Sequence, residues 1–106
     1  MAKYDVFPNP GAHARIAPYL LDAQSDLLDG LESRVVIPLR RLRDFPSTVK
    51  RPERLLPALQ IGDEAFFLDV PQMGAVPTRI LRHPVASLAS EHDRIAAALD
   101  FLFQGV

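Results

Sequence analysis

The 106 residues include no cysteine and no tryptophan. The lack of cysteine excludes a disulfide framework and thiolate metal sites, and it fits the reducing cytosol, where we expect the protein. No run approaches the roughly 20 apolar residues of a membrane helix, and residues 1–7 show no apolar segment of the kind found in signal peptides. The formal net charge is only −1, so the chain as a whole is not built to bind nucleic acid directly.

Recognisable catalytic and cofactor motifs are also missing. The sequence has no phosphate-binding glycine loop, no nucleophile elbow and no dinucleotide fingerprint. The three histidines, His13, His83 and His92, lack the spacing of metal ligands. Glu91, His92 and Asp93 are consecutive, so they would not face one another on a helix. The sequence therefore predicts a protein that is not an enzyme and that holds no metal or cofactor.

Ten prolines, about twice the usual share, are scattered along the chain and are typical of the turns and edges of a β-rich fold. Short apolar and β-branched segments between them predict strands. The predicted strands are residues 3–7, 19–24, 34–39, 55–61, 64–70 and 78–82. Gly62-Asp63 predicts a tight hairpin turn. Because proline cannot donate to a ladder, Pro38 predicts that its strand lies at a sheet edge or bends there.

The last part of the chain is predicted to be a helix, over about residues 87–104. Its apolar positions at helical spacing are Leu88, Ile95, Leu99 and Leu102. Ser87 or Ser90 is expected to cap the start, and Gly105 stands where a helix would end. Strands followed by one helix favour a single, mostly β domain, in which a small antiparallel barrel of about residues 3–82 packs against the helix.

The sequence ends on an apolar stretch, Phe101-Leu102-Phe103-Gln104-Gly105-Val106, with no polar tail. Chain ends are usually hydrophilic and frayed unless something covers them. We therefore expect this segment to be covered by the core, by a second copy of the chain or by a partner. Phe101 and Phe103 fall off the aliphatic face of the helix, so at least one of them is expected to face a second copy or a partner.

Four segments, in this order and spacing, resemble the CcdB-type toxins of bacterial toxin–antitoxin operons, which serve plasmid maintenance. They are Gln24-Ser25-Asp26-Leu27-Leu28-Asp29, Arg34-Val35-Val36-Ile37-Pro38-Leu39, Ile61-Gly62-Asp63-Glu64 and the helix ending Phe103-Gln104-Gly105-Val106. The resemblance covers nearly the whole chain. It implies a compact SH3-like β-barrel of the CcdB/MazF type and a homodimer. It also implies a cytoplasmic poison of DNA gyrase, neutralised by a cognate antitoxin with an acidic disordered tail.

The resemblance also implies which residues bind the gyrase A subunit. In the family, the last residues of both protomers insert between two gyrase A subunits near the dimer axis. The corresponding residues here are Asp100, Phe103, Gln104, Gly105 and Val106 at the helix end, with Leu27 and Leu28 in a loop. The family has a tryptophan at the position of Gln104, where its ring stacks on a gyrase arginine. Glutamine has no ring, so a cation–π attraction of about 0.5–2 kcal/mol is absent.

A basic stretch between Arg40 and Arg54 carries six cations and two carboxylates. The cations are Arg40, Arg41, Arg43, Lys50, Arg51 and Arg54, and the carboxylates are Asp44 and Glu53. The stretch could track a phosphate backbone, but Phe45 is its only aromatic residue for stacking on bases. We favour a loop that attracts the acidic antitoxin through Arg40, Arg41 and Arg43.

Two alternatives stay open on the sequence. Toxins with the same barrel include endoribonucleases, which need a basic groove and an acid–base pair; this chain has the arginines but no evident base. The other alternative is a family member that still binds antitoxin but no longer poisons gyrase, because Gln104 replaces the tryptophan.

Overall fold

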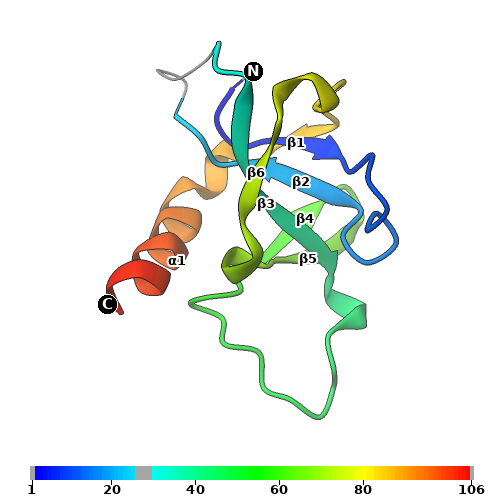
Figure 1. Cartoon of the computed structure of the whole chain (residues 1–106). Coiled ribbons are helices and arrows are strands. Elements are labelled where there is room, and N and C mark those ends of the chain that lie inside the picture. Colours follow the sequence, from blue (N-terminus) through cyan, green and yellow to red (C-terminus); the bar gives the residue numbers. More distant parts are fainter. Residues whose placement is uncertain (1, 26–29, 106) are drawn as a thin grey trace.

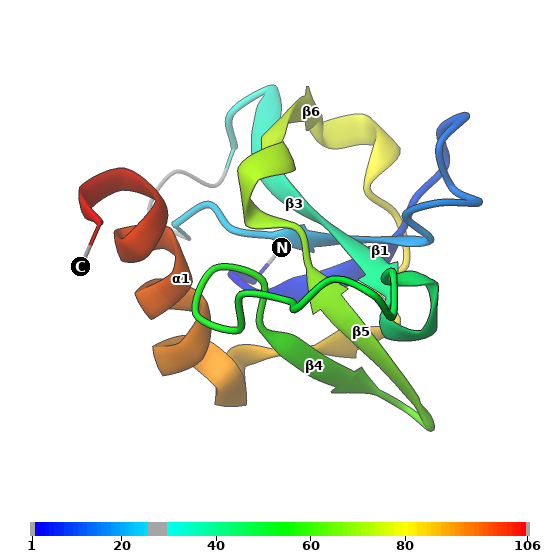
Figure 2. The same ribbon diagram turned by 90° about the horizontal axis from the view of Figure 1, so that it is seen from below.

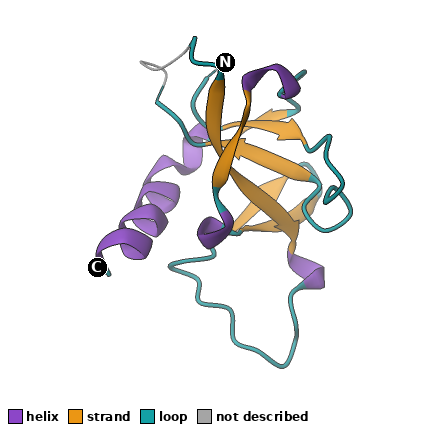
Figure 3. Ribbon diagram, viewed as in Figure 1, coloured by secondary structure: helices purple, strands orange, loops and turns teal. Residues whose placement is uncertain are grey.

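The computed structural model describes residues 2–25 and 30–105. Within these residues, seven strands form a nearly closed antiparallel barrel, and one α-helix at the C-terminal end lies against its side (Figure 1). Figure 3 shows the strands gathered in the barrel, short helical turns between some of them, and the one long helix leading to the C-terminus. The expected fold class, a small antiparallel barrel with a C-terminal helix, is therefore confirmed.

The strands are short and all pair in antiparallel fashion. They are β1 (Asp5–Pro8), β2 (Tyr19–Asp22), β3 (Ser33–Arg41), β4 (Ala58–Ile61), β5 (Glu64–Leu68), β6 (Gly74–Pro77) and β7 (Ala86–Ser87). Their order in the sheet is β4-β5-β3-β2-β1-β7, and β6 also pairs with β3. The predicted turn at Gly62-Asp63 is confirmed, because Ile61 pairs with Glu64 across it and Gly62 has a φ of +60°.

The long central strand β3 changes partners along its length. It pairs with β2 on one side, and on the other side it pairs first with β6 through residues 33–36 and then with β5 through residues 39–41. Pro38 lies in the gap between those two ladders, where its carbonyl accepts a hydrogen bond from the Asp69 N–H at 2.9 Å. Its missing N–H falls on the same side, so no ladder bond is lost. Of the two predicted alternatives for Pro38, the sheet edge was therefore wrong, because β3 has partner strands on both sides, and the bend stays a prediction.

The predicted strand at residues 78–82 was also wrong. Thr78–Ile80 form a single 3-10 turn, and the strand is the preceding segment, β6. Thr78 ends that strand by donating its backbone N–H to Glu32 and its hydroxyl to Leu31. The sequence of β6 does not favour a strand, because it begins with glycine and ends with proline, and both are depleted in strands. Its extended structure depends on pairing with residues 33–36 of β3.

The two faces of the sheet bury two separate apolar clusters. The larger cluster lies between the barrel and the helix and includes Val6, Leu21, Ile37 and Ile95. The smaller one lies on the opposite face and comprises Phe7, Leu20, Val36 and Leu81, with Val76 and Ile80 packed against it. Neighbouring residues of a strand point to opposite faces, so β1, β2 and β3 each contribute to both clusters.

The helix α1 spans His92–Gln104 and starts later than predicted. A 3-10 turn at Ala89–Glu91 precedes it, with Leu88 as its N-cap residue and no side-chain cap. The Ser87 hydroxyl oxygen accepts the N–H of Ala89, the first residue of that turn, at 3.3 Å. Glu91 is the N-cap residue of α1 and makes no side-chain cap, so the prediction of a serine cap for the helix itself was wrong.

The core-facing side and the end of the helix follow the prediction. Ile95 and Ala98 are fully buried, and Leu99 and Leu102 pack at the border of the larger cluster. The αL residue Gly105 caps the helix with a φ of +74°, as predicted. In the described part of the chain, no helix has the length and apolar character needed to cross a membrane.

Candidate functional site

The end of α1 presents one exposed face built from residues at helical spacing. Asp100, Phe103 and Gln104 stand at positions i, i+3 and i+4, so their side chains leave the same side of the helix. All three are exposed, and Phe103 retains 70% of its surface. The next residue, Gly105, is also exposed, and its N–H donates to the Phe101 carbonyl at 2.9 Å. Four of the predicted gyrase contacts therefore form one continuous surface.

The two phenylalanines of the helix end differ in their surroundings. The guanidinium of Arg54 lies over the Phe101 ring, 4.5 Å from its centroid, so this ring is partly covered within the chain. The Phe103 ring has no comparable cover in the part of the chain that the structure describes. Phe103 is therefore the phenylalanine that is exposed, and that it faces a second copy or a partner stays a prediction. An exposed aromatic side chain of this size is typical of an interaction surface.

The remaining predicted gyrase contacts, Leu27, Leu28 and Val106, lie outside the described residues. The two chain segments that lead to and from the loop of Leu27 and Leu28 are described, and a buried ion pair joins them. Arg34 and Asp22 are both completely buried, with Nη2 and Oδ2 2.5 Å apart and Nε and Oδ1 3.3 Å apart.

Gln24 extends this connection towards the loop. Its N–H donates to the Asp22 carboxylate at 3.1 Å, and its side-chain Oε1 accepts the N–H of Val35 at 3.1 Å. The backbone N–H of Ala23 also donates to the Val35 carbonyl at 3.0 Å. These bonds hold the end of β2 to the start of β3, immediately before and after the loop.

The structure separates the three arginines that were predicted to bind antitoxin. Arg40 and Arg41 are consecutive in β3, so their side chains leave opposite faces of the sheet. Arg40 pairs with Asp69 at 3.4 Å, and its guanidinium lies 5.3 Å from the centroid of the Phe67 ring. Arg41 and Arg43 both approach Glu64, at 3.3 and 3.8 Å. These three cations therefore already have anionic neighbours within the chain.

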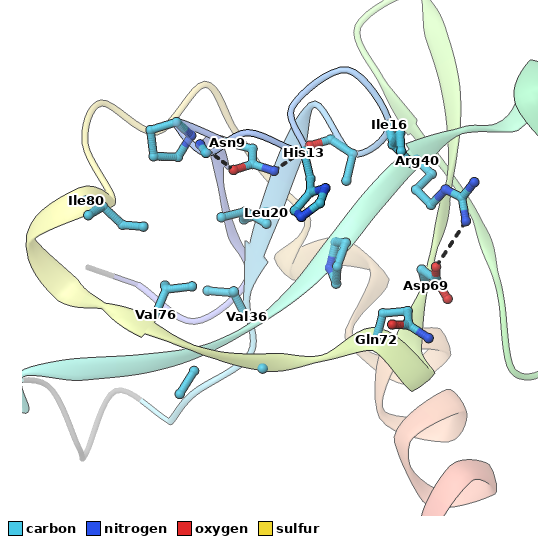
Figure 4. A pocket seen from close by; sticks show the side chains of 16 residues that line it. Asn9, His13, Ile16, Leu20, Val36, Arg40, Asp69, Gln72, Val76 and Ile80 are labelled. Carbon is cyan, nitrogen blue, oxygen red and sulfur yellow. Dashed lines mark hydrogen bonds and ion pairs between the residues drawn. The ribbon is translucent and has the colours of Figure 1, made fainter.

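A groove of about 750 Å³ opens on the opposite side of the sheet from the helix (Figure 4). Its walls are the loop between β1 and β2, the middle of β3, and β6. Leu20, Val36, Val76 and Ile80 line it, so the groove is the open side of the smaller apolar cluster. Asn9 braces the loop wall, because its side chain donates to the Ala17 carbonyl at 2.8 Å and accepts the Gly11 N–H at 2.9 Å.

The groove places His13 near Arg40, a combination that the sequence reasoning missed. The two residues are far apart in sequence, and no motif or spacing links them; only the return of β3 past the β1–β2 loop brings them together. The polar groups at this end of the groove are His13, Arg40, Asp69 and Gln72. Among the described residues of the lining, Arg40 is the only arginine or lysine, and it is paired with Asp69.

The other polar residues singled out in the sequence have structural neighbours. Glu91 pairs with Arg94 at 3.3 Å, and the His92 ring packs 5.5 Å from the ring of the buried Tyr4. Among the described residues, no group of three or more potential ligands is arranged to hold a metal ion. The exposed face of the helix end is the candidate functional surface, because Phe103 stands open there beside the exposed Asp100 and Gln104.

Comparison with known protein families agrees with the sequence resemblance. A family model described as CcdB protein matches residues 3–105. The match includes the whole barrel, α1 and the exposed face of the helix end.

Proposed function

The chain belongs to the CcdB family, and we propose that it is the toxin of a toxin–antitoxin pair, which binds and poisons DNA gyrase through the exposed end of α1. The observation that carries this proposal is the Phe103 ring, which stays 70% exposed at a helix end where the neighbouring Phe101 and Leu102 are partly buried. The family match supplies the class of target, and the geometry supplies the surface.

The proposed mechanism is binding without chemistry. α1 is anchored to the barrel by Ile95 and Ala98, and Leu102 in its last turn still packs against the larger cluster, so the helix is held to the barrel close to its end. Gly105, in the αL conformation, caps the helix at this end. Phe103 supplies apolar area, Gln104 a hydrogen-bonding amide and Asp100 a negative charge that can meet a cation on the gyrase A subunit. Leu27, Leu28 and Val106 complete the proposed contact surface.

We further propose that the active form is a homodimer. Gyrase presents two A subunits, and a toxin with two-fold symmetry can offer both helix ends to them at once. An isologous contact near a two-fold axis would also cover part of the apolar helix end in both copies. We expect light scattering at micromolar concentration to give twice the mass of one chain. A monomer across the accessible concentration range would contradict the proposal.

The ribonuclease alternative is not favoured by the groove. A cationic groove is needed to hold RNA phosphates, and here most lining side chains are aliphatic while Arg40 is paired with Asp69. His13 lines the groove, but a ribonuclease needs a second acid–base group as well. Among the described lining residues, the only carboxylate is that of Asp69, which is paired with Arg40.

The experiment that tests the proposed function uses purified gyrase, supercoiled plasmid and ATP. We expect the toxin to make gyrase accumulate cleaved DNA, because a poison traps the enzyme after it has cut. If gyrase gives the same yields of relaxed, supercoiled and cleaved DNA with and without toxin, the proposal is contradicted. Plasmid without gyrase is the control, and it should stay intact.

A further inference from the structure

The connection from β3 to β4 starts with a 3-10 turn and continues as a long segment, residues 45–57, without helix or strand, which reaches the side of α1. Seen from below, the segment runs from the 3-10 turn at Leu42–Asp44 towards the helix before it returns to β4 (Figure 2). It is held at both ends. The Phe45 ring packs edge-on against Phe67 at 5.2 Å, and Leu55 packs at the border of the larger cluster. Its position beside the helix is therefore part of the fold.

This segment and the helix enclose a shallow hollow of about 700 Å³. Its lining residues are Lys50, Arg51, Pro52, Glu53, Arg54 and Phe101. This set contains three cations and one carboxylate, so the hollow is positively charged, although the formal net charge of the whole chain is −1. Phe101, which the Arg54 guanidinium overlies, contributes an aromatic wall.

One of the three cations maintains the shape of the segment. Arg51 is only 14% exposed, donates Nη1 to the Leu56 carbonyl and pairs with Glu53 at 3.1 Å. The N–H groups of Leu55 and Leu56 both donate to the Pro52 carbonyl, at 3.1 and 2.8 Å, which closes a turn. Arg51 and Glu53 therefore neutralise each other.

The other two cations, Lys50 and Arg54, have no carboxylate within ion-pair distance in the part of the chain that the structure describes. This distinguishes them from Arg40, Arg41 and Arg43, which are paired with Asp69 and Glu64. An incoming carboxylate would have to displace an internal partner at those arginines. At Lys50 and Arg54 it would meet an uncompensated charge.

We propose that the hollow bounded by Lys50, Arg54 and Phe101 binds an acidic, extended segment of a partner protein. Carboxylates of that segment pair with Lys50 and Arg54, and its apolar atoms lie against the Phe101 ring. The proposal rests on the proposed function, in which the partner is the acidic tail of the antitoxin, and it replaces the paired arginines of β3 as the place where that tail binds.

The position of the hollow connects it to the helix end. Phe101, in the lining of the hollow, lies about one turn before Gln104 on α1. An occupant of the hollow therefore lies along the side of α1, next to the helix end where the proposed gyrase contacts are. The antitoxin would thus bind beside these contacts and not across the barrel at the apolar groove of Figure 4.

The test uses the full-length protein labelled with ¹⁵N and a short synthetic peptide of alternating glutamate and serine. We expect saturable amide shifts at Lys50, Arg54 and Phe101, and no shifts with the matching glutamine–serine peptide. Lys50→Gln and Arg54→Gln should each weaken binding about two- to fivefold, as expected for exposed ion pairs, and Arg54→Lys should retain most of it. Binding should also weaken with added salt.

Arg43→Gln is the matched control, because Arg43 is 73% exposed and belongs to the same basic stretch but approaches Glu64. We expect it to bind the peptide as the wild type does. Shifts centred on Arg40 or the apolar groove, or equal weakening by Arg43→Gln, would overturn the proposal. Titration of the gyrase A subunit with the same proteins separates the two proposals: peptide binding without gyrase binding overturns the proposed function alone, and the reverse result overturns this inference alone.

Discussion

Replacing Arg34 by methionine is expected to lower the free energy of unfolding by about 3–5 kcal/mol. Arg34 and Asp22 are both fully buried and joined by two contacts. Without the guanidinium, the Asp22 carboxylate loses both of these contacts in a site closed to water, and the N–H of Gln24, which donates to it at 3.1 Å, does not replace them. An uncompensated buried charge is much more costly than a lost surface contact.

Chemical denaturation of the two proteins measures this difference, and Arg94→Met is the matched control. Arg94 also pairs with a carboxylate, Glu91 at 3.3 Å, but it is 50% exposed, so we expect this variant to lose less than about 1 kcal/mol. The double variant Asp22→Leu/Arg34→Met should recover most of the loss, because it removes both charges together. Equal losses in Arg34→Met and Arg94→Met would show that the buried pair contributes little.

Gln104→Trp is expected to strengthen binding to the gyrase A subunit about five- to a hundredfold, or about 1–3 kcal/mol. Gln104 is exposed on the same helix face as Phe103, so a larger ring can be placed there without entering the core. The gain has two sources, the apolar area that the ring buries and the attraction of its face for a gyrase arginine.

Gln104→Leu separates these two sources. Leucine adds apolar area without an aromatic face, so its gain should be clearly smaller than that of tryptophan. Titration calorimetry with the same gyrase A preparation measures all three proteins. If the wild type already binds at full strength and Gln104→Trp changes nothing, the target is bound by another surface of the protein.

Local patterns predicted the elements that local chemistry decides. The Gly62-Asp63 turn, the Gly105 cap and the core-facing side of α1 each depend on a few neighbouring residues, and all three are found in the structure. Pro38 shows the limit of this reasoning. Proline does exclude a ladder bond, but the gap between two different partner strands satisfies that requirement in the middle of the sheet as well as an edge would.

In the candidate site, too, the features that depend on neighbouring residues could be predicted from the sequence, and those that depend on long-range contacts could not. Exposure of Phe103 could be predicted, because it follows from the angle of one residue on a helix. The pairing of Arg40 with Asp69 and of Arg41 with Glu64 could not, because β5 and the turn after it bring these carboxylates from distant parts of the sequence. The charge of the basic stretch was evident from the sequence, but which of its cations remain available to a partner depends on these long-range pairs.

The central claim is that the helix end binds the gyrase A subunit, and titration of that subunit with wild type and Phe103→Ser tests it most directly. Val85→Ser is the control, since Val85 is also exposed, at 52%, and lies outside the proposed surface. We expect the wild type and Val85→Ser to bind alike and Phe103→Ser to lose about 2 kcal/mol or more, roughly thirtyfold in affinity, with the dimer mass unchanged. No binding by the wild type, or equal binding by Phe103→Ser, would contradict the account.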